Sequence, residues 1–321
     1  MKAIQVQQFG GPEVLQIMDL AVPRPGESEV LVRVKAAGVN PYDTYMRSGA
    51  YGARNPKLPY TPGSDAAGVV ESVGPGCDRF QIGARVYTSG TLSGAYAEFA
   101  LCKLDQVHAL PERISYSQGA GVYVPYATAY RSLFQLAHAK RDEVVLVHGA
   151  SGGVGTAAIQ WARAVGLKVI GTAGSDRGLQ IVTEQGADHA FNHKSENYQK
   201  EILDATQGHG VDVILEMLAN VNLGQDLKML AYRGRVVVIG SRGDVQIMPR
   251  DIMVREAIVT GVFLWSVPSG EAAEIHAALR AGLTNGLLQP VVGTELPLAS
   301  AAESHRRIME SGAVGKIVLV P

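Results

Sequence analysis

The pattern of hydrophobic and polar positions changes near residue 115. Before this point, short runs rich in β-branched and aromatic residues are separated by turns with glycine or proline, and no long helical pattern occurs. The strand-like runs lie at 29–39, 68–74, 84–90 and 96–102. Their spacing predicts a small, barrel-like all-β unit.

After residue 115, apolar strand-like runs alternate with helical stretches. The strands are predicted at 143–148, 167–174, 189–193, 211–218, 235–240 and 257–264. Helices are predicted at 153–166 and 177–186. Such alternation is typical of a doubly wound α/β domain whose parallel strands are buried on both faces. A helix at about 270–283 and a strand at 316–320 follow, and we expect this tail to rejoin the first unit.

Composition narrows the class of protein. The 321 residues are enough for two domains of ~150 residues each. A net charge of −1 gives no field that would hold a polyanion or an acidic membrane. The chain starts with no signal-like segment and contains no apolar run of membrane-spanning length. Two cysteines, Cys77 and Cys102, suit a reducing compartment, although one disulfide between them stays open. We therefore expect a cytoplasmic protein.

A glycine-rich turn follows the predicted strand at 143–148, in the segment VLVHGASGGVGTAAIQWAR (145–163). Ala150, Gly152 and Gly155 fill the frame G-x-G-x-x-G. Small residues in this frame allow a tight turn, a close approach to a pyrophosphate and flush packing of the next helix. The helix N-terminus adds N–H groups and partial positive charge. A lone glycine motif also fits any tight βα turn, but the strand before it and the helix after it favour dinucleotide binding.

The end of the next strand indicates which dinucleotide is bound. NAD sites usually carry an acidic residue ~20 residues after the motif, which binds the ribose 2′-hydroxyl. This chain has Gly174, Ser175, Asp176 and Arg177 there. A small tip, a hydroxyl and a cation suit a 2′-phosphate, so we predict NADPH, with Gly174, Ser175 and Arg177 near the phosphate. Asp176 argues the other way, and Arg177 also fits a solvated residue that opens a helix.

Several segments outside any generic nucleotide motif resemble the zeta-crystallin-type quinone oxidoreductases, which are zinc-independent medium-chain dehydrogenases/reductases. The segments are FGGPEVL (9–15), GVNPYDTYMRSGAYG (38–52), PYTPGSDAAGVVESVG (59–74), HGASGGVG (148–155), EMLANVN (216–222) and IGSRG (239–243). The resemblance covers essentially the whole chain. It implies a GroES-like β-barrel catalytic domain over 1–122 and 266–321, and an NADP-binding Rossmann domain over 123–265. It also implies an active site in the cleft between these domains.

The same resemblance implies a set of cofactor contacts. They are Tyr45, Ser151, Gly152, Gly153, Val154, Gly174, His193, Asn222, Ile239, Gly240, Ser241, Arg242, Val262, Phe263 and Leu264. Thr128 falls where relatives bring a hydroxyl near the nicotinamide. Judged without the resemblance, His193 is an ordinary loop histidine, Asn222 a helix N-cap and Thr128 a simple helical threonine.

The residues that build a zinc site in related alcohol dehydrogenases are missing. Zinc requires several cysteine or histidine ligands. The first ligand position falls in GVNPYDTY, which offers Asn40 and Asp43, and the second falls in PGSDAAG, which offers Ser64 and Asp65. Two cysteines cannot form a four-cysteine structural lobe. We therefore predict that the protein uses no metal.

These predictions lead to one reaction. Without zinc, no Lewis acid stabilises an alkoxide, whereas a quinone accepts a hydride readily. We predict that the protein transfers hydride or electrons from NADPH to a quinone. The catalytic candidates are Asn40, Tyr45 and Tyr51, because an aromatic ring can stack on the quinone and a hydroxyl or amide can bind its oxygen. Tyr51 also fits a surface aromatic in a glycine-rich loop.

Other functions stay open at this stage. Relatives on this fold also reduce the C=C bond of enals and enones. The resemblance further raises binding of AU-rich RNA or a structural crystallin role, but no basic stripe supports RNA. Relatives form homodimers or homotetramers through the edge of the Rossmann sheet, so we expect a homo-oligomer.

Overall fold

The computed structural model describes residues 1–312 and 314–321. By the contacts between its residues, the chain divides into two compact units, residues 1–124 with 289–321 and residues 125–288. This division differs from the predicted domain limits mainly at residues 266–288. That segment contains α9 (Ser269–Asn285), whose Glu271 pairs with Arg131 of the second unit. The limits of the functional domains stay a prediction.

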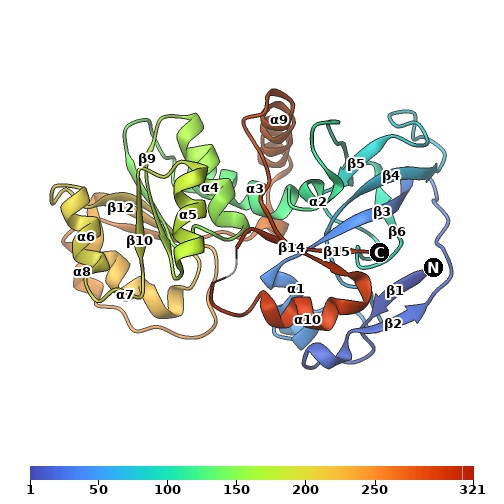
Figure 1. The fold of residues 1–321 in the computed structure, drawn as a ribbon, viewed down its shortest axis with the longest axis horizontal. Helices are drawn as coiled ribbons and strands as arrows, with labels where there is room; N and C mark the ends of the chain where they lie inside the picture. Colours follow the sequence, from blue (N-terminus) through green and yellow to red (C-terminus); the bar gives the residue numbers. More distant parts are fainter. Residues whose placement is uncertain (313) are drawn as a thin grey trace. The chain divides into compact units, whose positions relative to one another are not determined.

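The first unit is built on a seven-stranded sheet whose strands come from both ends of the chain (Figure 1). The order is β14-β15-β3-β4-β5-β7, and β6 also pairs with β3. Only β14 and β15 run parallel. The bounds are β3 Glu29–Val39, β4 Asp65–Val73, β5 Arg85–Thr88, β6 Phe99–Lys103, β7 Val107–Ala109, β14 Val292–Pro297 and β15 Lys316–Val320. The last strand of the tail, β15, thus lies in the first unit as expected, whereas the helix α9 before it belongs to the second unit.

Smaller elements complete this unit. Strands β1 (Lys2–Gln5) and β2 (Gln16–Asp19) form an antiparallel pair. The short helices are α1 (Pro41–Ser48), α2 (Tyr116–Gly119) and α10 (Ala301–Arg307). Apolar side chains from β3 and β15, among them Val32, Val39 and Leu319, share one core. Each such side chain contributes ~1.5–3 kcal/mol on burial, which fixes β15 against β3.

The second unit holds a parallel six-stranded sheet with the order β10-β9-β8-β11-β12-β13. The strand bounds are β8 Val144–Val147, β9 Lys168–Ala173, β10 His189–Asn192, β11 Val211–Glu216, β12 Leu230–Val238 and β13 Ile258–Gly261. The chain runs outward from β8 in one direction and then crosses to β11, so the order reverses at β8. This is the predicted doubly wound arrangement, which places a ligand site at the carboxyl ends of the strands.

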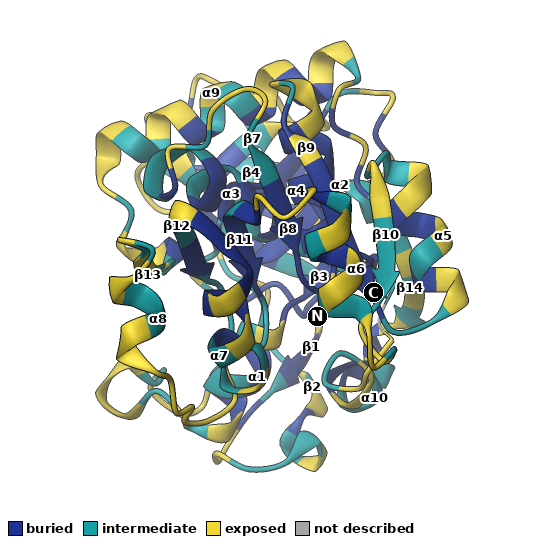
Figure 2. Ribbon diagram, turned by 90° about the vertical axis from the view of Figure 1, so that its left-hand side faces the viewer, coloured by how far each residue is buried: buried dark blue, intermediate teal, exposed yellow. Residues whose placement is uncertain are grey.

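Helices precede, connect and follow the parallel strands. They are α3 (Tyr123–Tyr130), followed by a π-helical turn at Arg131–Leu136, then α4 (Gly153–Ala164), α5 (Asp176–Gln185), α6 (Tyr198–Ala205), α7 (Ala219–Met229), α8 (Pro249–Met253) and α9. Figure 2 shows β8 and β11 as buried, whereas α8 carries exposed residues. The sequence pattern predicted α4, α5 and α9 but not α6, α7 or α8.

Two further findings bear on the predicted environment. Cys77 and Cys102 are both buried and free, so the disulfide between them does not form. Within residues 1–312 and 314–321, no helix is both long enough and apolar enough to span a membrane. The cytoplasmic location stays a prediction.

Candidate functional site

The predicted cofactor-binding segments of the second unit gather at one edge of its sheet. The turn at 149–155 follows β8, Gly174 follows β9, and His193 follows β10. On the other side of β8, residues 217–222, 239–242 and 262–264 follow β11, β12 and β13. Because parallel strands bring their carboxyl ends to the same edge, segments far apart in sequence become neighbours.

The glycine turn has the geometry of a phosphate-binding loop. Gly149 has a φ of +56°, which favours glycine. A Cβ atom on Gly155 would lie 2.5 Å from the Gly149 carbonyl oxygen, so only glycine lets α4 pack this closely. The N-cap of α4 is Gly152, which has no side chain to accept from the first N–H groups of the helix. Ser151, Gly153 and Val154 belong to the same turn, as predicted. An anionic phosphate is the type of ligand that suits such a helix N-terminus.

The tip after β9 lies against the segment that follows β10. A Cβ atom on Gly174 would lie 2.6 Å from His193 Nε2 and 3.1 Å from Lys194 Cε. Sequence analysis did not single out Lys194. The register of the two strands could have found it, because Ala173 lies opposite Asn192 and the next residues of both strands must therefore meet. Lys194 brings a cation to the tip.

Ser175 and Arg177 have structural roles beside the predicted one. Ser175 is the N-cap of α5, where its Oγ accepts from Gly178 N at 3.2 Å. Arg177 Nη1 donates to Gln180 Oε1 at 3.1 Å, and its side chain is 63% exposed. Arg177 is thus exposed in the first turn of α5, and its contact with the 2′-phosphate stays a prediction. Partial burial lowers the pKa of His193, and His148 and then Lys194 act in the same direction, so this ring is neutral near pH 7.

Asn222 does not cap a helix. The N-cap of α7 is Leu218, and Asn222 lies within the helix. The alternative assignment of Asn222 as an N-cap is therefore wrong, because the helix begins one turn earlier than that assignment required. The Asn222 Nδ2 atom donates instead to Glu216 Oε1 at 3.1 Å.

The segments after β12 and β13 are held by backbone hydrogen bonds. Ile239 N and Gly240 N both donate to the Glu216 carbonyl oxygen, at 2.8 and 3.2 Å. Arg242 N donates to Asn220 Oδ1, and Ser241 Oγ donates to the Gly243 carbonyl oxygen. Val262 N donates to the Val238 carbonyl oxygen, and Phe263 precedes a short 3-10 turn at Leu264–Ser266. Thr128 is buried in α3 at 7% exposure.

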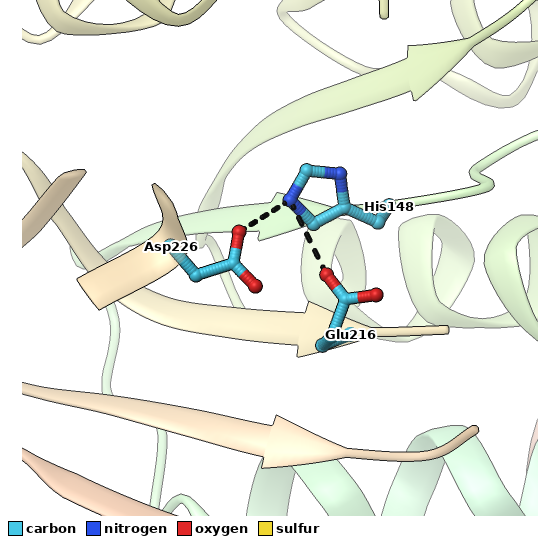
Figure 3. A group of neighbouring side chains, drawn as sticks. All are labelled: His148, Glu216 and Asp226. Carbon is cyan, nitrogen blue, oxygen red and sulfur yellow. Dashed lines mark hydrogen bonds and ion pairs between the residues drawn. The ribbon is translucent and has the colours of Figure 1, made fainter. Parts of the chain in front are cut away.

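A buried polar cluster lies behind this edge, and sequence analysis missed it (Figure 3). His148 Nε2 is 2.9 Å from Asp226 Oδ1 and 3.6 Å from Glu216 Oε2. His148 precedes the glycine turn, Glu216 ends β11, and Asp226 lies in α7. One ligand atom from each residue lies within 4.8 Å of the others, a grouping of a size that can also hold a metal ion. We call these three residues the buried triad.

In the first unit, Asn40 takes part in a buried ionic network. Lys316 Nζ donates to Asn40 Oδ1 at 2.5 Å and to Asp65 Oδ2 at 2.9 Å. Asn40 Nδ2 also donates to Asp65 Oδ2, at 3.0 Å. Asn40, Asp65 and Lys316 are all at most 4% exposed. Gly38 makes room for this network, because a Cβ atom there would lie 2.6 Å from Lys316 Cε.

Asp43 is the other acidic residue at the positions that hold zinc ligands in related alcohol dehydrogenases, and it has different partners. Its Oδ2 atom accepts from Asn40 N at 2.9 Å and from the Tyr96 hydroxyl at 3.1 Å. The Tyr96 hydroxyl also lies 3.2 Å from His305 Nε2. Burial raises the pKa of Asp43 to about 7 and lowers that of His305 to about 3. Near neutral pH, this second network therefore contains a neutral histidine and a carboxyl group able to hold a proton.

The tyrosines of α1 and the following loop form a partly exposed aromatic group. Tyr51 lies 5.4 Å from Tyr42 and 6.2 Å from Tyr45, measured between ring centroids. Burial raises the pKa of Tyr51 and raises that of Tyr42 to about 12, so both hydroxyls stay protonated. A cavity of about 560 Å³ opens beside α1 and is lined by Tyr42, Asp43, Met46 and residues from 56–64 and 91–94. Tyr42, which was not predicted, therefore belongs both to the aromatic group and to the lining of this cavity.

Comparisons with known proteins extend over the full chain. Residues 26–133 match the family "Alcohol dehydrogenase GroES-like domain", and residues 153–281 match "Zinc-binding dehydrogenase". The human protein named "Quinone oxidoreductase" is 52% identical over 322 residues, which cover 100% of this chain and 98% of the human one. The structure of Escherichia coli quinone oxidoreductase complexed with NADPH has a TM-score of 0.91 at 31% identity and covers both chains completely. CurK enoyl reductase has a TM-score of 0.89 at 26% identity, with coverage of 99% of this chain and 98% of that one.

The predicted fold class is thereby confirmed, with a GroES-like part and a doubly wound Rossmann part. On sequence identity over its whole length, this chain belongs to the zeta-crystallin-type quinone oxidoreductases, oxidoreductases of the medium-chain dehydrogenase/reductase family.

Proposed function

We propose that this protein is an NADPH-dependent quinone reductase that works without zinc. The observation that carries the proposal is the buried network in which the Lys316 ammonium group contacts Asp65, a residue at one of the positions that hold zinc ligands in related alcohol dehydrogenases. Family membership supports the quinone as substrate, and the NADPH complex of the Escherichia coli relative supports the cofactor.

The residues at the former ligand positions do not fit zinc. Asp65 Oδ2 already accepts from Lys316 and Asn40, and Asn40 Oδ1 accepts from Lys316. To bind here, zinc would have to displace the Lys316 ammonium group from a buried carboxylate. The ligands then available to it would be only amide and carboxylate oxygens. Zinc sites in this class of enzyme rely on cysteine and histidine. No step of the proposed reaction therefore involves a metal.

The second unit fits a phosphorylated dinucleotide. The glycine turn leaves helix N–H groups for the pyrophosphate, and Gly174 leaves space beside a histidine ring and the Lys194 ammonium. When bound, NADPH would supply the hydride that reduces the quinone. The chain supplies placement: Lys194, His193 and Ser175 around the 2′-phosphate, and Asn222 with residues 239–242 and 262–264 along the nicotinamide half. Arg177 can reach the phosphate only by leaving Gln180.

The first unit supplies hydrogen bonds and aromatic surface for the quinone. Both Asn40 side-chain atoms are already bonded within the Lys316 network, so only the second Nδ2 hydrogen is left to meet an oxyanion. Tyr45 and Tyr51 offer rings for stacking and hydroxyl groups that can donate to a developing oxyanion. Catalysis would then rest on orientation and hydrogen bonding rather than on a dedicated acid.

One competing reaction has direct support. The likeness to an enoyl reductase makes reduction of a conjugated C=C bond the alternative. Parallel NADPH oxidation assays with an ortho-quinone and with alkenals separate the two. Preferred turnover of the ortho-quinone supports the proposal, and preferred turnover of the alkenal refutes it. RNA binding has no comparable support and would appear as retention of AU-rich RNA that NADPH displaces.

We further propose that the protein is a homo-oligomer paired through β13. This strand ends the six-stranded sheet and leaves apolar side chains exposed, with Ile258 at 57% and Val259 at 37%. An open, apolar edge strand is a ready template for pairing with a second copy. Whether pairs assemble further into tetramers is decided by the mass of the protein in solution.

A further inference from the structure

The buried triad holds two carboxyl groups that lack enough hydrogen-bond donors. Glu216 Oε2 and Asp226 Oδ2 are buried and have no hydrogen-bond partner within the described residues. Both side chains are 0% exposed. Two facing carboxylates are costly to bury without donors. A single proton between them would supply the missing donor and remove one negative charge.

The surroundings of the triad favour this protonated state. Burial raises the pKa of Glu216 to about 7 and that of Asp226 to about 7. Burial lowers the pKa of His148, which is therefore neutral at pH 7. A neutral ring suits the geometry, because Nε2–H can donate to Asp226 Oδ1 while Nδ1 accepts from the Thr172 hydroxyl at 3.2 Å. The ring then supplies one donor to the two carboxyl groups, and the shared proton supplies the other.

Three of the predicted cofactor-binding segments are attached to this network. His148 leads directly into the glycine turn. Thr172, which lies two residues before Gly174, accepts at its carbonyl oxygen from Ala150 N in that turn. Glu216 Oε1 accepts from Leu218 N and Asn222 Nδ2. The Glu216 carbonyl oxygen accepts from Ile239 N and Gly240 N. The Glu216 side chain thereby orients Asn222 and the start of α7, whereas its backbone carbonyl holds the segment after β12.

We propose that the buried triad is a positioning network for the dinucleotide: one proton shared by Glu216 and Asp226 fixes the Glu216 side chain, which holds Asn222 in the geometry that binds NADPH. The inference rests on the proposed NADPH dependence. Glu216 acts through Asn222 and is a positioning residue. The Asn222 amide is oriented with Nδ2 toward Glu216, so its Oδ1 atom is not engaged by Glu216.

The network makes NADPH binding sensitive to alkaline pH. Loss of the shared proton leaves two adjacent carboxylates, which repel each other and displace Glu216. The folded state holds this proton more tightly than the unfolded chain, so its stabilising effect is complete in acid and disappears as pH rises through about 7. The other titratable groups that face the triad are Tyr198 of α6 and His193 after β10. Burial raises the pKa of Tyr198 and lowers that of His193, so neither changes charge between pH 7 and 9.

The test is the dissociation constant of NADPH, measured by fluorescence titration from pH 6.5 to 9. Glu216→Gln keeps an acceptor oxygen for Asn222 and directs an N–H donor at Asp226, which mimics the protonated acid. Glu216→Leu removes both. Glu201→Gln, on the exposed face of α6, is the matched control. We expect the wild-type constant to rise by up to about tenfold per pH unit at its steepest. Glu216→Gln should stay within about twofold across the range, and Glu216→Leu should bind at least tenfold more weakly at pH 6.5, since a lost buried hydrogen bond is worth about tenfold or more.

Three results would overturn the inference. The first is the same alkaline weakening in wild type and Glu216→Gln. The second is Glu216→Gln binding as weakly as Glu216→Leu. The third is a stoichiometric metal ion in the wild type that Glu216→Gln loses, because a cation would then occupy the place given to the proton. Thermal unfolding without NADPH separates this inference from the proposed function. The melting temperature of Glu216→Gln minus that of the wild type should increase from pH 5 to 8, and a constant difference would refute the shared proton even if NADPH did not bind.

Discussion

Replacement of Lys316 by methionine tests the buried network of the first unit. Methionine keeps most of the side-chain volume but removes the ammonium group, so Asp65 keeps only the Asn40 amide and Val124 N as donors, at 3.0 and 3.1 Å. Removing one partner of a buried ion pair costs ~3–5 kcal/mol. Because two N–H donors remain on Asp65, we expect the lower end, about 3 kcal/mol of unfolding free energy.

A surface pair in the same chain provides the control. Lys200 and Asp204 are 2.6 Å apart, and their side chains are 73% and 63% exposed. Lys316 and Asp65 are 2.9 Å apart, and their side chains are 4% and 1% exposed. The two pairs share the same chemistry, have N–O distances within 0.3 Å of each other and differ mainly in burial. Because solvent screens an exposed i,i+4 pair, Lys200→Met should cost several times less than Lys316→Met.

Urea unfolding followed by far-UV circular dichroism measures these differences. Both tryptophans, Trp161 and Trp265, lie in the second unit, so fluorescence reports that unit separately. Lys316→Met combined with Asp65→Asn removes the unpaired charge and should regain at least half of the loss. The reasoning is refuted if Lys316→Met costs no more than Lys200→Met, or if the double variant is less stable than the single one. NADPH affinity should be unchanged in Lys316→Met, while quinone turnover falls because Asn40 loses its orientation.

Three further predictions concern the proposed function. Lys194→Ala and Arg177→Ala should each weaken NADPH binding about tenfold, since a charge-assisted hydrogen bond contributes ~1.5–3 kcal/mol, while NADH binding changes little. Equal losses of affinity for both cofactors in titrations would show that neither residue binds the 2′-phosphate. Tyr51→Phe should lower kcat for an ortho-quinone only modestly and Tyr51→Ala should lower it further, and complete loss in Tyr51→Phe would indicate a dedicated acid. Val259→Asp should shift the protein toward monomer in sedimentation experiments, and an unchanged mass would place the interface elsewhere.

The β3 strand and the Rossmann sheet could be predicted because their signals are local. The run at 29–39 matches β3 residue for residue, and β8, β9 and β11 follow apolar runs bounded by glycine or charge. The helix α7 was missed because ANVNLGQDLKM contains two asparagines and a glycine, which are poor helix formers. Packing against β11 and β12 stabilises this helix, and sequence periodicity does not record such contacts.

The site was predictable where a motif or a resemblance gave its residues, and not where polar groups meet through the fold. Asp65 and Lys316 are 251 positions apart, and only the pairing of β15 with β3 and of β3 with β4 brings them together. The same holds for His148, Glu216 and Asp226, which come from the residue after β8, the end of β11 and the helix α7. Sequence analysis discarded Asp43 and Asp65 as ligands for lack of a neighbouring histidine or cysteine, but had no means of finding the lysine that neutralises Asp65.

The most direct test of the central claim is NADPH-dependent turnover of an ortho-quinone by protein whose metal content has been measured. We predict steady oxidation of NADPH by protein that contains well under one zinc ion per chain, at a rate unchanged after exhaustive treatment with a chelator. NADH should support the reaction less well at equal concentration. Turnover that appears only when zinc is bound at one ion per chain, and is lost with it, would contradict the account.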